Sequence, residues 1–267
     1  MFMDKMTILI LSCDKFSDLW EGHIKLLEEN WPDRNMRACI VTDCETDRCF
    51  PNVDIIVAAN QPEWSDRLKV ALQQVNTEYV FVTLDDYFLI EQVQNEKIAN
   101  VINMMTKENI DYVRLFARPK RANGTKLEGY RGMRRINTDE NYSVNLYAGI
   151  WKKWFLEKTT EESLSAWKFE IRLPRVARNN NARCVVSSNN EFVILDVVRK
   201  GKLLHKSAHY FKKHPGIYNG SREVNTWAYE IKLGIRTLGV RHAPKCVVNA
   251  ARNFMIKRGH HYFSQDA

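Results

Sequence analysis

The sequence predicts an α/β protein built on a mostly parallel sheet with helices on its faces. Over residues 1–118, short apolar segments rich in β-branched residues alternate with helical patterns, which is typical of βαβ units. The segment 79–84 (YVFVTL) is apolar almost throughout, as expected of a strand buried on both faces. Asp85 and Asp86 follow it directly. The carboxyl end of such a strand is where open α/β sheets bind ligands, so the pair predicts a ligand site.

The individual elements follow from residue patterns along the chain. We expect strands over residues 6–12, 37–42, 53–58, 79–84, 112–116, 184–187 and 192–198. Apolar residues at helical spacing predict helices within 20–31, 98–105 and 227–238. A further helix, capped by Ser65, is expected between the third and fourth strands, and Gly239 is expected to end the last helix.

The stretch 119–142 interrupts this pattern because it is basic and polar and contains three glycines. It predicts a long loop, which is either a flap over a phosphate-bearing ligand or a solvated basic segment. The pattern therefore divides the chain into halves of one compact domain, residues 1–118 and 119–267. The basic and aromatic segment 250–263 either lies on an anionic membrane surface or packs on the domain.

Composition narrows the class of protein. No apolar segment approaches the roughly 20 residues that span a bilayer, and no signal-peptide core is present, so we expect a cytoplasmic protein. The six cysteines form no CxxC pair, which favours free thiols over structural zinc. A net charge of +8 indicates an anionic partner: a nucleotide or phosphate substrate, an acidic membrane surface, or nucleic acid. Neither GxGxxG nor GxxxxGK[ST] occurs, which argues against a dinucleotide dehydrogenase and a P-loop NTPase.

Polar side chains gather where the predicted parallel strands end. The candidates at this edge are Ser12, Asp14, Asp43, Arg67, Asp85 and Asp86. Such a set suits a nucleoside diphosphate, whose phosphates need positive charge or a divalent metal held by carboxylates. Further along, Glu170 lies beside aromatic residues. It is either a general base with a raised pKa or a solvent-exposed helix residue.

Several segments in order resemble GT-A-fold glycosyltransferases, especially bacterial family-2-like enzymes of surface polysaccharide biosynthesis. They are the strand with its Asp-Asp pair and the segments WSDRL (64–68), LYAGIW (146–151), SAWKFE (165–170) and VRKGK (198–202). The resemblance covers roughly residues 6–205. It implies a GT-A-like, Rossmann-like mixed sheet flanked by helices. Residues 1–118 would bind the nucleotide sugar, and residues 119–267 would bind the acceptor and supply the catalytic base.

The resemblance also implies roles for single residues. Ser12 and Asp14 would line the donor site, Asp43 would contact the base and Arg67 the nucleotide. Asp85 would touch the ribose or the metal, Asp86 would ligate Mn²⁺ or Mg²⁺, and Glu170 would be the catalytic base. The family usually separates its two carboxylates by one residue, whereas here they are adjacent. Which of the two aspartates ligates the metal therefore stays open.

The expected activity is that of a Leloir-type, hexosyltransferase-like enzyme. It would transfer a sugar from a UDP- or GDP-linked donor to a glycan or lipid-linked glycan, with inversion, at the inner face of an anionic membrane. Two alternatives stay open. A nucleotidyltransferase normally has a Gly-rich loop after the first strand, and residues 12–17 lack glycine. A non-catalytic protein could bind nucleotide sugars or nucleic acid, but no nucleic-acid-binding motif is present, so no nucleic acid is expected.

Overall fold

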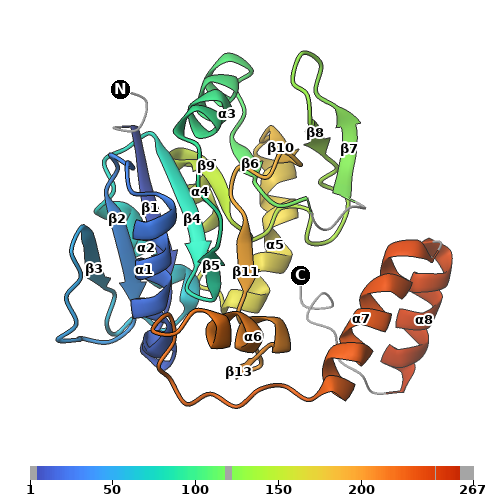
Figure 1. The fold of residues 1–267 in the computed structure, drawn as a ribbon. Helices are drawn as coiled ribbons and strands as arrows, with labels where there is room; N and C mark the ends of the chain where they lie inside the picture. The colour runs from blue at the N-terminus through green and yellow to red at the C-terminus, as the bar shows by residue number, and fades with distance from the viewer. Residues whose placement is uncertain (1–4, 118–121, 244, 259–267) are drawn as a thin grey trace.

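A computed structural model describes residues 5–117, 122–243 and 245–258 of the chain. Nine strands form one sheet: β1 (Met6–Leu11), β2 (Ala38–Thr42), β3 (Val53–Val57), β4 (Tyr79–Leu84), β6 (Tyr112–Arg114), β7 (Asn123–Lys126), β8 (Met133–Ile136), β9 (Gly149–Lys152) and β10 (Cys184–Ser187). Their spatial order is β3-β2-β1-β4-β9-β6-β10-β8-β7 (Figure 1). Two small sheets pair β5 (Tyr87–Leu89) with β11 (Ile194–Asp196), and β12 (Val198–Arg199) with β13 (Lys202–Leu203).

The sheet is mixed, with a parallel half that contains the candidate site. Strands β3, β2, β1 and β4 are all parallel. Strand β9 lies antiparallel between β4 and β6, and β10 pairs parallel with β6. The remaining two strands, β8 and β7, continue the sheet in antiparallel fashion to its far edge. The predicted fold class, a mixed and largely parallel α/β sheet flanked by helices, is confirmed.

Helices cover both faces of the sheet. They are α1 (Trp20–Asn30), α2 (Trp64–Gln73), α3 (Asn95–Lys107), α4 (Lys153–Thr159), α5 (Ala166–Asn179), α6 (His205–Lys213), α7 (Trp227–His242) and α8 (Lys245–Lys257), with a 3-10 helix η2 (Asp14–Leu19) before α1. Side chains of α1 and α3 pack on one face, and those of α2, α4 and α5 on the other. Among the described residues, none of these helices has the length and apolar character needed to cross a bilayer.

Strands β1 and β4 are apolar almost throughout because both of their faces are covered by helices. Ile8 and Phe81 belong to the core under α1 and α3, whereas Leu9 and Val82 belong to the core under α2 and α5. All four side chains are completely buried. Because successive side chains of a strand point to opposite faces, a strand covered on both faces is apolar at nearly every position.

Gly22 in α1 is required by a close approach between two segments. A Cβ atom at this position would overlap the carbonyl oxygen of Ile217, in the connection between α6 and α7. We expect Gly22→Ala to lower the free energy of unfolding by roughly 1–3 kcal/mol, because backbone has to move to make room. Urea denaturation measures this. The matched control is Gly234→Ala in α7, where no heavy atom lies within 4 Å and where alanine favours the helix. Equal midpoints for the two variants would contradict the close approach.

The prediction of a long loop over 119–142 is wrong. Strands β7 and β8 form a hairpin there that extends the sheet at its edge. Met133 and Ile136 are buried, and the two arginines between them leave this strand only weakly apolar, which hid it. Basic side chains are a common protection of edge strands against further pairing. The predicted loop residues Lys120 and Arg121 lie outside the described part of the chain, as do residues 259–263 of the C-terminal segment.

Two helix ends also differ from the expectation. Glu63, not Ser65, is the N-cap of α2, where Glu63 and Asp66 form a capping box. Ser65 is buried instead. Its hydroxyl donates to the carbonyl oxygen of Glu162 at 2.8 Å and accepts from the amide of Leu164 at 2.7 Å. At the other end of the chain, α7 continues through Gly239 to His242.

Candidate active site

Asp85 lies at the carboxyl end of β4, where it contacts the end of β1. Its backbone amide donates to the carbonyl oxygen of Leu11 at 3.3 Å. Its side chain is only 7% exposed and accepts a hydrogen bond from the Ser12 hydroxyl. That hydroxyl in turn accepts from the indole nitrogen of Trp20 at 2.6 Å. The predicted pair Ser12 and Asp85 is therefore brought together, and α1 orients both residues through Trp20.

The Ser12 hydroxyl makes a testable contribution to stability. We expect Ser12→Ala to lower the free energy of unfolding by about 2 kcal/mol, since it leaves the buried Trp20 indole and an Asp85 oxygen without their partner. Chemical denaturation checks this against Ser188→Ala, which removes one exposed hydroxyl contact and should stay within about 0.5 kcal/mol of wild type. A loss at Ser12 no larger than that at Ser188 would mean that the Ser12 contacts do not hold the strand ends together.

A buried histidine, His23, contacts the backbone of the Asp85–Asp86 turn. His23 Nδ1 lies 3.2 Å from the carbonyl oxygen of Asp85, and burial lowers the pKa of His23 to about 4. The imidazole is therefore neutral at physiological pH, and Nδ1 carries the proton that the carbonyl accepts. The Asp85–Asp86 turn is fixed on both its side-chain and its backbone atoms.

Asp86 differs from Asp85 because one of its carboxylate oxygens has no partner. Asp86 Oδ1 is buried and makes no hydrogen bond, and the same is true of Asp196 Oδ1 at the end of β11. The two residues are neighbours because Asp196 pairs with Tyr87 in the β5–β11 ladder and the amide of Val197 donates to the Asp86 carbonyl at 2.9 Å. Burial raises the pKa of Asp86, and the negative charges of Asp85 and Asp196 raise it further. Two neighbouring carboxylates that each have one buried oxygen without a hydrogen-bond partner favour a bound cation.

Arg199 provides the positive charge of this cluster. Its guanidinium contacts Asp196 Oδ2 at 3.1 Å through Nε and at 2.5 Å through a terminal nitrogen. Burial raises the pKa of both Asp86 and Glu170, and the positive charge of Arg199 opposes the shift at both residues, so Arg199 is within electrostatic range of both. Tyr147 stacks on Tyr87 with ring centroids 5.7 Å apart; burial raises the pKa of Tyr147, and the charge of Arg199 opposes that shift. Arg199 therefore connects the end of β4 to the region around α5.

Glu170 lies in the first half of α5 and is only partly exposed. The backbone amide of Leu146 approaches Glu170 Oε1 at 3.4 Å. Burial raises the pKa of Glu170, whereas the Leu146 amide and Arg199 lower it. Pro174 stands four residues later and has no amide hydrogen, so the Glu170 carbonyl lacks its usual helical partner. The Glu170 side chain is half-buried in α5, and its role as a general base stays a prediction.

Asp14, Asp43 and Arg67 form a second cluster on the other side of the Ser12–Asp14 loop. Arg67 donates to Asp43 Oδ2 at 2.7 Å, and the amide of Asp14 donates to Asp43 Oδ1 at 2.8 Å. Burial raises the pKa of the intervening Cys13, and the charges of both Asp85 and Asp43 raise it further. The structure thus brings all the predicted donor-site residues to one edge of the sheet, in two clusters separated by this loop.

Four residues of the site were not predicted from the sequence. Tyr147, Asp196 and Arg199 lie around Asp86, and Arg222 binds Asp18. Arg199 and Tyr147 lie in segments that carry the resemblance, but Asp196 had no local signal, because the β5–β11 pairing that places it is long-range. Arg222 binds both oxygens of Asp18, at 2.7 and 2.6 Å, and the carbonyl of Lys15 at 2.8 Å. It holds η2 against the segment before α7. Burial raises the pKa of Asp85 to about 7, and the hydrogen bond from Ser12 and the charge of Arg222 oppose this shift.

The chemistry of the carboxylates allows a test of the implied divalent metal. Within residues 5–117, 122–243 and 245–258, no group of three or more histidine, cysteine or acidic side chains is arranged to hold a metal. Mg²⁺ and Mn²⁺ do not need such a group, since they commonly bind one or two carboxylates together with water and substrate phosphates. The unpartnered oxygens of Asp86 and Asp196 meet this requirement. The residues present therefore fit a divalent cation that is completed by a phosphate ligand.

Comparison with known proteins identifies the fold. No protein-family model and no curated protein sequence matches the chain. Among solved structures, S. aureus TarS 1-349 in complex with UDP-GlcNAc matches with a TM-score of 0.52 and 15% identity, over 74% of this chain and 60% of that one. The mannosyltransferase PcManGT from Pyrobaculum calidifontis, in complex with GDP-Man and Mn²⁺, matches with a TM-score of 0.47 and 14% identity, over 74% and 58% of the two chains.

A third similar structure is the bifunctional IspDF from Campylobacter jejuni, with a TM-score of 0.43 and 14% identity, over 72% of this chain and 52% of that one. The chain spans between 36% and 60% of the length of the TarS chains that it matches. The mixed sheet, its flanking helices and the TarS match define a GT-A-like α/β fold.

Proposed function

We propose that this protein is a Leloir-type glycosyltransferase that uses a UDP- or GDP-linked sugar. The observation that carries the proposal is the pair of unpartnered carboxylate oxygens of Asp86 and Asp196, beside Arg199 and within its range of Glu170. The pair supplies a place for the cation that a diphosphate brings, and Glu170 supplies a base. The GT-A-like fold and the UDP-GlcNAc bound to TarS support a nucleotide sugar as the ligand.

The donor nucleotide is assigned to the cluster around the Ser12–Asp14 loop. Asp43 accepts hydrogen bonds from the base, with its carboxylate oriented by Arg67 and the Asp14 amide. Ser12 and Asp14 line the donor site, and Arg67 contributes positive charge to the nucleotide. Asp85 faces the ribose, since its carboxylate is already oriented by Ser12. This division leaves Asp86, with Asp196, as the metal-binding residue of the adjacent pair.

A divalent cation, Mn²⁺ or Mg²⁺, held by Asp86 and Asp196 would neutralise charge on the leaving diphosphate. Glu170 accepts the proton of an acceptor hydroxyl; burial raises its pKa, which makes it a stronger base than an exposed glutamate. The hydroxyl oxygen then forms a bond to the anomeric carbon while the bond to the diphosphate breaks, and the electron pair leaves with the nucleoside diphosphate. A single displacement of this kind inverts the anomeric configuration. Arg199 binds Asp196 and supplies positive charge near both Asp86 and Glu170.

The acceptor is proposed to be a glycan or lipid-linked glycan in surface polysaccharide biosynthesis, on the cytoplasmic side of a membrane. Trp154 of α4 and Trp167 of α5, the helix that carries Glu170, are 42% and 60% exposed and are suited to stacking on sugar rings. Trp151 is fully buried and belongs to the core instead.

A thermal-shift panel tests this proposal. We expect UDP or GDP, and the corresponding nucleotide sugars, to raise the melting temperature in the presence of Mn²⁺ and to raise it less in EDTA. A nucleotidyltransferase would instead respond to a nucleoside triphosphate and release pyrophosphate. Absence of a shift with every nucleoside diphosphate and sugar nucleotide, with and without metal, would contradict a donor site.

A further inference from the structure

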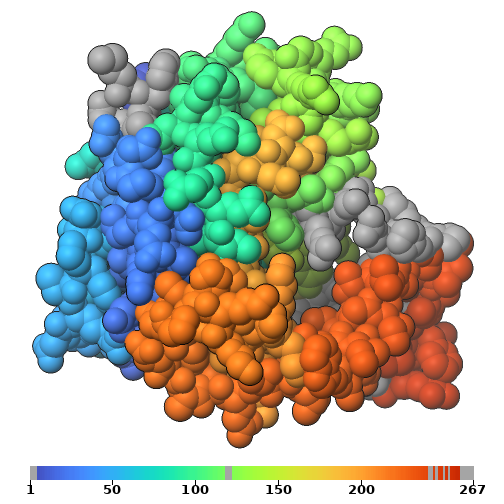
Figure 2. All heavy atoms as spheres, in the orientation of Figure 1, coloured from blue at the N-terminus to red at the C-terminus, as the bar shows by residue number. Residues whose placement is uncertain are grey.

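Helices α7 and α8 carry large apolar side chains that are exposed in the part of the chain that the structure describes. Trp227, Ile231, Ile235 and Leu238 repeat along one face of α7 and are 66%, 58%, 67% and 56% exposed. Val247 and Phe254 of α8 are each 53% exposed. We call these six residues the apolar surface of the C-terminal helices. Figure 1 shows both helices away from the sheet, and in Figure 2 their residues form one side of the molecule next to those of α6.

Among the side chains that the structure describes between residues 227 and 258, none is buried. All residues from 231 to 239 are exposed, so more than two turns of α7 have no buried side chain. Isolated helices of about this length are only marginally stable in water and obtain most of their stability from packing of an apolar face. Several large apolar side chains exposed together on one side of a folded protein mark an interaction site.

Charge indicates what covers the apolar surface. Residues 227–258 contain seven lysines and arginines and one glutamate, a net charge of +6 out of +8 for the whole chain. Lys232 and Arg236 are exposed and flank Ile231 and Ile235 along α7. A second copy of the chain would bring two strongly positive segments together, which disfavours self-association. Nucleic acid would satisfy the charge but would leave the isoleucines and leucines in water.

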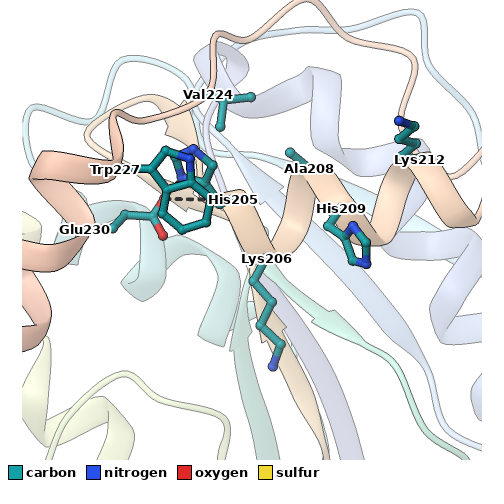
Figure 3. Close-up of a pocket in the computed structure, with 8 residues that line it drawn as sticks. All are labelled: His205, Lys206, Ala208, His209, Lys212, Val224, Trp227 and Glu230. Carbon is teal, nitrogen blue, oxygen red and sulfur yellow. Dashed lines mark hydrogen bonds and ion pairs between the residues drawn. The ribbon is translucent and has the colours of Figure 1, made fainter.

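Helix α6 connects this surface to the candidate active site. His205 at the start of α6 hydrogen-bonds Glu230 of α7 at 2.9 Å and stacks on Trp227 with ring centroids 3.7 Å apart (Figure 3). The segment before α6 returns to the site, since the amide of Leu204 donates to the Val197 carbonyl at 3.0 Å, one residue after Asp196. The start of α6 therefore contacts the start of α7, and the residue just before α6 is hydrogen-bonded next to Asp196 in the candidate active site.

The surface of α6 adds to the positive charge. An open depression of about 710 Å³ lies between α6 and the start of α7, with Lys206, His209 and Lys212 along its α6 side (Figure 3). Trp227 and Glu230 also line it, Glu230 being hydrogen-bonded to His205, so cationic and aromatic groups lie together. Basic side chains beside exposed aromatic and aliphatic residues are characteristic of helices that lie in the interface of an anionic bilayer.

We propose that α7 and α8, together with the basic side of α6, bind the surface of a bilayer that contains anionic phospholipids. The apolar surface enters the interfacial region, and the flanking lysines and arginines pair with lipid phosphates. Neither helix crosses the bilayer. The proposal concerns attachment and does not depend on sugar transfer, so its test uses binding to lipid vesicles and needs no enzymatic activity.

The test is flotation of the full chain with phosphatidylcholine vesicles that contain 0 or roughly 30% phosphatidylglycerol. We expect binding only with the anionic lipid, and weaker binding at high salt, where screening reduces attraction to the surface. Lys232→Gln with Arg236→Gln should weaken binding roughly twenty- to thirtyfold, because each cation near the surface contributes about a fivefold factor. Ile231→Ser with Ile235→Ser should reduce it at least tenfold, on the order expected from lost apolar burial.

The matched control is Lys97→Gln with Lys107→Gln on α3, which removes the same charge from exposed positions of the domain. It should reduce binding less than threefold. Because all the substituted side chains are exposed, every variant should keep the thermal melting temperature of wild type. Three outcomes would overturn the proposal: no binding to anionic vesicles, equal loss for the α3 and α7 charge variants, or a dimer by light scattering that the Ile231/Ile235 variant dissociates while vesicle binding is absent.

Discussion

Asp86→Asn is expected to reduce turnover of the nucleotide sugar by about a thousandfold or more, because removing the charge that holds a catalytic cation costs several kcal/mol of transition-state stabilisation. The same substitution should raise the melting temperature. Burial and the charges of Asp85 and Asp196 raise the pKa of Asp86, so its ionised form is disfavoured in the folded state at pH 7. Asparagine removes that charge and should increase the free energy of unfolding by about 1 kcal/mol. Release of nucleoside diphosphate and thermal unfolding measure the two effects.

The pH dependence of this stabilisation follows from the direction of the pKa shift. Below the pKa of an unfolded aspartate, about 4, Asp86 is protonated in both the folded and the unfolded state, so the difference in stability between wild type and the Asp86→Asn variant should vanish there. It should grow as the pH rises and the unfolded carboxyl ionises. Asp33→Asn, at an exposed position after α1, is the control and should change neither activity nor stability. If Asp86→Asn retained the wild-type rate, the assigned role of Asp86 would be wrong.

Glu170→Gln is expected to lower kcat by about 10²–10⁴, the contribution typical of a general base, with little change in nucleotide affinity. In wild type, kcat/KM should fall as the pH falls through the pKa of Glu170. Because burial raises this pKa, the fall should occur at a higher pH than for an exposed glutamate. The pH profile of the variant should lose this acid limb, which steady-state kinetics between pH 5 and 9 would record.

A matched change distinguishes the base from a general effect of lost charge. Glu96→Gln in α3 removes one carboxylate from an exposed position and should leave both the rate and the pH profile unchanged. Full activity of Glu170→Gln, with the acid limb intact, would assign the base to another group. A fall in nucleotide affinity with kcat unchanged would make Glu170 a structural residue of α5.

The parallel half of the fold was predictable because its strands are buried on both faces. Residues such as Ile8, Leu9, Phe81 and Val82 report burial by being apolar in succession, and the polar residues that follow such strands must lie at the edge of the sheet. For the same reason the neighbourhood of Ser12 with Asp85, and of Asp43 with Arg67, could be anticipated from the sequence.

The remaining parts depend on interactions that leave little local trace. Asp196 reaches Asp86 through a three-residue strand that pairs more than 100 residues away along the chain, and no periodicity reveals such a pairing. The β7–β8 hairpin is polar because it lies at an edge. In α7 the spacing of Trp227, Ile231, Ile235 and Leu238 predicts the apolar face correctly, but spacing contains no information about which surface covers it.

Calorimetric titration of the donor nucleotide into three proteins tests the division of the site most directly. Wild type should bind UDP or GDP more tightly with Mn²⁺ than with EDTA. Asp86→Asn should keep the metal-independent binding and lose the enhancement by Mn²⁺, whereas Asp43→Asn should bind weakly under both conditions. Equal enhancement by Mn²⁺ in wild type and in Asp86→Asn would contradict the account of a metal–diphosphate site at the end of β4.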